Sequence, residues 1–118
     1  MSKRSLTFSH DDPWPDGLVV KFYLVPFPYR RKPVINVREE AARPQRIADV
    51  PMALLNASQR GVTDTGLAKA HKVTALPRAY EEEDGRYTIA DGHHRVVAAW
   101  LRGEDQVRIR IIGLPRKR

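Results

Sequence analysis

The chain has 118 residues, of which 42% are hydrophobic, and this suits one domain with a modest core. It contains no cysteine, which excludes disulfides, thiolate metal ligands and thiol catalysis. Its formal net charge of +7 favours a polyanionic partner, because each cation that neutralises a phosphate releases a counterion. The basic N-terminus precedes no apolar signal core, and the longest apolar run is far too short to cross a bilayer. We therefore expect a cytoplasmic protein with no membrane partner.

Composition divides the chain into an N-terminal arm (1–17), a folded domain (18–113) and a basic tail (114–118). The arm is polar, and its prolines and glycine disfavour a helix or a central strand. Trp14 is the residue of this arm that could anchor it to the folded domain.

The first half of the domain mixes strand and helix signals. Residues 18–25 are rich in β-branched and aromatic residues, which predicts a strand, and 33–37 predicts a second, shorter one. The segment 48–59 reads as a helix with Asp49 as its N-cap, and Gly61 is placed to end it.

The next segment predicts a hairpin. A short helix is expected around 67–71, and 74–80 is expected to be an edge strand because Pro77 cannot donate a ladder hydrogen bond. The acidic run 81–85 then forms a solvated turn into a strand at 86–90.

The C-terminal part predicts one helix and one strand. The helix spans 95–102 and ends at a glycine, Gly103. Residues 106–112 alternate basic and apolar side chains, which indicates a half-buried strand with Arg108 and Arg110 on one open face.

The sequence D-G-H-H-R lies between the strand expected at 86–90 and the following helix, so the chain bends there at Gly92. Glycine lets the backbone approach a ligand closely, and the first free amides of a helix point at that ligand. Arg95 adds a guanidinium for bidentate phosphate contact. His93 and His94 can donate further hydrogen bonds, more strongly when protonated. This turn is a candidate anion site.

Asp91 immediately precedes the bend, and an acid there suggests a metal partner, a proton acceptor or an N-cap. The plainer alternative is that Asp91 only caps the helix while both histidines are exposed. Zinc is not expected at the adjacent histidines, since neighbours on a helix point about 100° apart and no further ligands are visible.

Residues 85–99 resemble the signature of the ParB/sulfiredoxin superfamily, which carries a strand, a G-x-[HR]-R turn and an alanine-rich helix. Upstream, 43–46 and 58–62 resemble its Pro-x-Arg segment and the end of its preceding helix. The resemblance implies an α+β fold: a small ParB/sulfiredoxin-like mixed sheet with helices packed around it. It also implies a nucleotide (ATP, ADP or CTP) with Mg²⁺. The phosphate contacts it implies are Gly92, His93, His94, Arg95 and, as a second contact, Arg46.

Departures from the superfamily patterns separate its branches. Sulfiredoxins place their catalytic cysteine where His93 stands, so sulfinic acid reduction is excluded. Chromosome-partition ParB proteins carry G-E-R-R and a following helix-turn-helix domain, so a full partition factor is not expected in a chain ending at Arg118. The D-G-H-H-R motif is closer to that of the free-serine kinases of this superfamily. Those kinases use an upstream acidic residue as catalytic base, and Glu39 or Glu40 would correspond to it here. The plainer reading of those two is a charged helix start.

Positive charge is concentrated in three places, which would form a phosphate-tracking surface if they shared a face. No recognition helix is visible, so we expect contact with nucleic acid that is not sequence-specific. Scattered solvated charge is the alternative. The residues concerned are Arg30, Arg31, Lys32, Arg108, Arg110, Arg116, Lys117 and Arg118.

The leading hypothesis is a stand-alone ParB-like domain that binds nucleotide or nucleic-acid phosphate and acts in DNA transactions, with NTPase or nuclease activity as its catalytic form. There Arg95 would stabilise phosphoryl charge and His94 would donate a proton, while Asp91, Glu39 or Glu40 would hold Mg²⁺ or activate the nucleophile. The alternatives are a free-serine-type kinase and a non-catalytic adaptor that docks on an acidic protein. A homodimer is also open.

Overall fold

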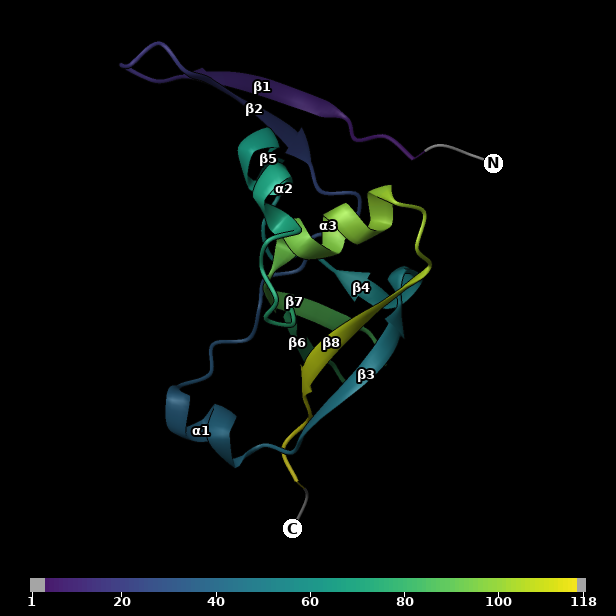
Figure 1. The fold of residues 1–118 in the computed structure, drawn as a ribbon. Coiled ribbons are helices and arrows are strands. Elements are labelled where there is room, and N and C mark those ends of the chain that lie inside the picture. The colour runs from purple at the N-terminus through teal and green to yellow at the C-terminus, as the bar shows by residue number, and fades with distance from the viewer. Residues whose placement is uncertain (1–3, 117–118) are drawn as a thin grey trace.

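The computed structural model describes residues 4–116 and shows an α+β fold whose strands form two sheets (Figure 1). Within those residues no helix is both long and apolar enough to span a membrane. The elements in chain order are β1 (Phe8–Pro13), β2 (Val19–Leu24), α1 (Val37–Ala42), β3 (Gln45–Pro51), the 3-10 turn η1 (Met52–Leu54), β4 (Leu55–Asn56), β5 (Gly61–Thr63), α2 (Asp64–Ala70), β6 (Arg78–Glu81), β7 (Tyr87–Asp91), α3 (His93–Leu101) and β8 (Gln106–Ile112).

The larger sheet has the order β3-β8-β6-β7-β4 and holds the core. It is mixed, because β6 runs parallel to β8 and β4 parallel to β7 while the other pairs are antiparallel. Helix α3 packs on one face of this sheet, where Val96 and Ala99 meet side chains from the strands. This confirms the expected α+β class with a mixed sheet. The buried cluster comprises Val50, Met52, Leu55, Ala79, Ile89, Val96, Ala99, Ile109 and Ile111.

The smaller sheet is antiparallel, with the order β1-β2-β5, and its hairpin β1–β2 projects away from the larger sheet (Figure 1). Strand β2 confirms the prediction for 18–25. The arm expected at 1–17 contains a strand, β1, which lies at the sheet edge and ends at Pro13, where a missing amide hydrogen is tolerated.

Two predictions in the first half were wrong. Residues 33–37 form no strand, because Asn36 caps α1 by accepting a hydrogen bond from the Glu39 amide at 2.8 Å. The segment 48–59 is not a helix but the end of β3, then η1 and β4. Every residue of β3 pairs with β8, and this long-range pairing outweighs the local helix signal.

The second half follows the sequence more closely, with one correction. Strand β6 lies between β8 and β7 rather than at an edge. It begins at Arg78, one residue after Pro77, so the proline removes no ladder hydrogen bond. The hairpin β6–β7 and the exposed face of Arg108 and Arg110 on β8 are confirmed. The helix expected at 95–102 is also present, but α3 begins at His93, so both histidines belong to its first turn.

Candidate functional site

The bend between β7 and α3 depends on Gly92. This residue caps α3 with a φ of +91°, a conformation that side chains disfavour. A Cβ at Gly92 would also lie 2.7 Å from Nη2 of Arg95 and 2.9 Å from Cβ of Pro77. Since the amide of Val96 is the one that bonds to the Gly92 carbonyl, the amides of residues 93–95 precede it and face the helix end.

His93 is buried, with 4% of its surface exposed, so the alternative of two exposed histidines is wrong. Its Nε2 accepts a hydrogen bond from the Ser58 amide at 3.0 Å, which leaves the ring hydrogen on Nδ1. Burial, and next the neighbouring His94, lower the pKa of His93 to about 4, against an opposing effect of Asp91. The ring is therefore neutral at pH 7.

His94 is seated in the same way between α3 and α2. Its Nε2 accepts from the amide of Thr63 at 3.1 Å, so it also carries its hydrogen on Nδ1. Gly66 leaves room for this ring, because a Cβ at that position would overlap Nε2 of His94. Burial lowers the pKa of His94, which favours the neutral ring. Both rings therefore accept a backbone hydrogen bond at Nε2 and carry a hydrogen on Nδ1 that can be donated.

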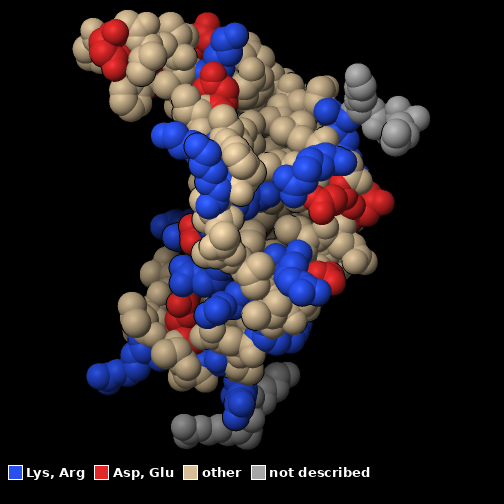
Figure 2. Space-filling model, in the orientation of Figure 1, with Lys and Arg blue, Asp and Glu red and all other residues tan. Residues whose placement is uncertain are grey.

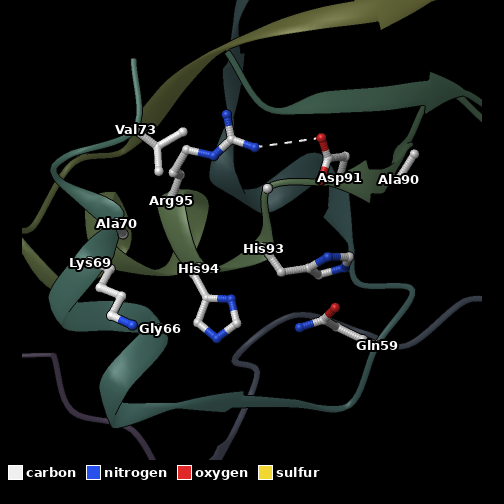
Figure 3. Close-up of a pocket in the computed structure, with 11 residues that line it drawn as sticks. Gln59, Gly66, Lys69, Ala70, Val73, Ala90, Asp91, His93, His94 and Arg95 are labelled. Carbon is white, nitrogen blue, oxygen red and sulfur yellow. Dashed lines mark ion pairs between the residues drawn. The ribbon is translucent and has the colours of Figure 1, made fainter. Parts of the chain in front are cut away.

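Arg95 and Asp91 lie on the other side of the turn from the two imidazole rings (Figure 3). Their nearest charged atoms are 3.6 Å apart, and the Arg95 guanidinium also donates to the carbonyl of Ala75. Gly92 rather than Asp91 occupies the N-cap position, so the capping role considered for Asp91 is wrong. The arginine is thus held at the turn by partners from two segments.

An open cavity of about 300 Å³ lies at this turn, between α2 and the N-terminus of α3 (Figure 3). Lys69 of α2 also lines it, and Lys32 lies near enough to contribute to lowering the pKa of His93. Lys69 could not be predicted from the sequence, because its spacing from the turn carries no local signal. The lining residues are Gln59, Gly66, Lys69, Ala70, Val73, Ala90, Asp91, Gly92, His93, His94 and Arg95.

Three residues predicted for the site do not line this cavity. Glu39 pairs with Arg43 at 3.1 Å on its own helix. Glu40 accepts hydrogen bonds from the Tyr80 hydroxyl at 2.6 Å and from Arg78 at 3.2 Å. The third, Arg46, instead bonds Glu81 and the Tyr87 hydroxyl, both at 3.4 Å.

The cavity offers a magnesium ion few oxygen ligands of its own. Asp91 supplies the one carboxylate among the lining residues, and it already faces Arg95. Magnesium prefers several oxygen ligands in octahedral geometry. Within residues 4–116 no group of three or more His, Asp or Glu side chains is arranged to hold a metal ion.

The predicted nucleic-acid residues are only partly free of acidic neighbours. Arg30 pairs with Asp84 at 2.7 Å and with Glu82 at 3.4 Å. Arg108 pairs with Asp49 at 3.2 Å across β3 and β8. Lys117 and Arg118 lie outside the described residues. The exposed members of the set are Arg31, Lys32, Arg108, Arg110 and Arg116.

No protein-family model matches the chain, and a search of curated proteins finds no significantly similar sequence. The fold class therefore rests on the structure, while the likeness to the ParB/sulfiredoxin superfamily rests on the motifs alone.

Proposed function

We propose that this protein binds the phosphate of a nucleotide, ATP, ADP or CTP, in the cavity between α2 and α3, as a small ParB-like domain acting in DNA transactions. The supporting observation is that backbone amides, two neutral imidazoles and two cations surround one cavity of about 300 Å³. That volume is at the lower end of ligand sites and suits a phosphate group with part of its nucleoside.

The donors around the cavity suit an anion. The amides of residues 93–95 lie at the positive end of the α3 dipole. Because Nε2 of each histidine accepts a backbone hydrogen bond, each ring keeps an Nδ1 hydrogen for donation. A neutral donor binds phosphate without depending on protonation near pH 7.

The two cations have different roles in this proposal. Arg95 is held by Asp91 and by the Ala75 carbonyl, so it stabilises the turn as well as adding positive charge. Lys69 is exposed on α2, and its ammonium can move to the ligand. We expect the Lys69 ammonium to move closer to the phosphate on binding, whereas the Arg95 guanidinium stays in place.

Nucleic-acid binding that is not sequence-specific is the second part of the proposal, and exposed cations such as Arg31, Lys32 and Arg110 support it. Because Glu39 and Glu40 lie away from the cavity, no observation favours the kinase alternative. We propose no hydrolysis, since fold does not dictate chemistry.

The test is calorimetric titration of the full chain with ATP, ADP, CTP and a short DNA, each with and without Mg²⁺. Lys69→Ala should weaken nucleotide binding about tenfold, the size of one desolvated charge-assisted contact. The control is Lys72→Ala, which removes the same charge from an exposed residue outside the cavity lining. Arg95→Ala should abolish binding, with its fold checked by circular dichroism.

Equal loss in the Lys69 and Lys72 variants would indicate diffuse electrostatic attraction and contradict the cavity as the site. Binding of DNA that ignores Lys69→Ala and Arg95→Ala would move the function to the exposed cations. No binding of any nucleotide would refute the nucleotide proposal and leave the adaptor alternative.

A further inference from the structure

The outer part of the hairpin β1–β2 lacks cover. Strand β5 pairs with Phe22–Leu24 of β2, and among residues 4–116 no third strand pairs with the hairpin beyond these residues. Its tip, residues 14–19, exposes Trp14 (53%), Leu18 (62%) and Val19 (51%). A two-stranded ribbon is marginally stable in water, and adjoining exposed apolar side chains mark an interaction site.

The hairpin differs in charge from the rest of the chain. Residues 8–24 hold three of the 14 carboxylates (Asp11, Asp12 and Asp16) and one of the 21 cations (Lys21), a formal charge of −2. The remaining 20 cations and 11 carboxylates give +9. Figure 2 shows acidic side chains on the projecting hairpin and mostly basic side chains over the body below it. Another copy of this chain is therefore a charge-complementary partner for the hairpin.

The larger sheet offers a matching surface at its edge strand. Ile47 of β3 is 56% exposed and lies opposite Arg110 of β8. Gln45, Arg46, Ile47 and Arg110 surround an open cavity of about 350 Å³, here named the sheet-edge surface. Among the described residues, Arg110 forms no ion pair. The surface combines an apolar centre with positive charge, the reverse of the charge at the hairpin tip.

We propose that the hairpin tip of one copy docks on the sheet-edge surface of a second copy. Trp14 and Leu18 would cover Ile47, while Arg110 would face the aspartates of the hairpin and the indole ring. The hairpin and the start of β3 lie at opposite ends of a molecule 55 Å long (Figure 1), so the contact forms between chains. If it is reciprocal it closes a two-fold dimer, and otherwise it continues into larger assemblies.

The first test is sedimentation velocity of the full chain over a range of protein concentrations and salt. Association should weaken with added salt, because exposed charges are screened. The double variant Trp14→Ser/Leu18→Ser and the single variant Ile47→Ser should each weaken it at least about tenfold. A mixture of the two variants should associate again, because each supplies the half that the other lacks. All these residues are exposed, and circular dichroism checks that each variant is folded.

The second test uses the absence of cysteine from the chain. A mixture of Leu18→Cys and Ile47→Cys proteins should form a mixed disulfide under mild oxidation. The control mixture pairs Leu18→Cys with Val73→Cys. Val73 is 49% exposed but lies at the cavity between α2 and α3, away from the sheet-edge surface. That control mixture should form far less mixed disulfide.

Four outcomes would overturn the proposal. One is a monomer at every concentration reached. Another is association that both variants leave unchanged. A third is association lost in the hairpin variant alone, with no recovery on mixing and only cross-links between two copies of position 18, which would show a hairpin-to-hairpin dimer. The fourth is binding of the hairpin by nucleic acid or by another protein without self-association.

Discussion

Gly92 is required for two separate reasons at the residue scale. Its φ of +91° is costly for any residue with a side chain, and Arg95 and Pro77 fill the space where a Cβ would stand. Gly85 shares the first constraint, with a φ of +83°, but has nothing within 4 Å of its Cβ position. Comparing substitutions at Gly85 and Gly92 therefore distinguishes the cost of backbone strain from the cost of steric overlap.

We predict that Gly85→Ala lowers the free energy of unfolding by about 1 kcal/mol, the conformational cost alone. Gly92→Ala should cost about 1–3 kcal/mol more, because Arg95 and Pro77 must also shift. Urea unfolding of both variants measures the difference. Equal costs would show that the packing around Gly92 yields freely.

His93 makes stability depend on pH. Its pKa is about 4 in the folded protein and near 6.5 when unfolded, so the unfolded chain takes up the proton first as pH falls. The stabilisation is therefore complete above pH 6.5 and is lost between about 6.5 and 4. It is on the order of 3 kcal/mol.

We predict that His93→Gln flattens this dependence, since the glutamine oxygen can still accept from the Ser58 amide but does not titrate. Chemical unfolding at several pH values between 4 and 8 measures the slope. His71→Gln, which replaces an exposed imidazole, is the control and should keep the slope. A slope unchanged by His93→Gln would contradict the assignment.

At the scale of the elements, the Arg86 side chain links β4 and η1 to β7 through hydrogen bonds. Strand β4 has only two residues, and its parallel pairing with β7 would be weak alone. The Arg86 guanidinium donates to Oδ1 of Asn56 at 2.8 Å and to the carbonyls of Ala53 and Leu55 at 3.1 and 3.0 Å. It therefore ties η1 and β4 to the start of β7.

We predict that Arg86→Met lowers the free energy of unfolding by about 2–4 kcal/mol, because the buried Asn56 and the two carbonyls lose their charged donor. Arg108→Met is the matched control. Arg108 is exposed and, within the described part of the chain, pairs only with Asp49, so its loss should change stability little. Denaturant unfolding checks both, and similar effects from the two variants would refute the fastening role.

At the scale of the whole molecule, the candidate site lies where the two sheets meet. Helix α2 follows β5 of the smaller sheet, and α3 packs on the larger one. The contacts of His94 with Thr63 and of Gly66 with His94 join them. The cavity between these helices therefore depends on how the two sheets are docked.

The shape of the molecule follows from its projecting hairpin. The radius of gyration is 15.4 Å. A compact domain of this length would have about 13.5 Å. Since the hairpin is acidic and the rest of the chain is basic, the long axis also separates opposite charges. A net charge alone would not have revealed this separation.

Local signals in the sequence were enough for the segment that carries the site. The hairpin β6–β7, the bend at Gly92 and the end of α3 at Gly103 were predicted because each has a glycine where φ is positive. Alternation along β8 likewise placed Arg108 and Arg110 on one exposed face. These features depend on neighbours within a few residues, so the sequence by itself determines them.

Only the tertiary structure decided the rest. Residues of β3 became a strand because β8, about sixty residues later, pairs with them. Lys69 joined the cavity, and Glu40 was drawn to Tyr80, through packing between distant elements. Burial also made His93 a neutral hydrogen-bond acceptor rather than a protonated donor. Long-range pairing and desolvation have no signature in a local pattern, because both depend on which surfaces meet when the chain folds.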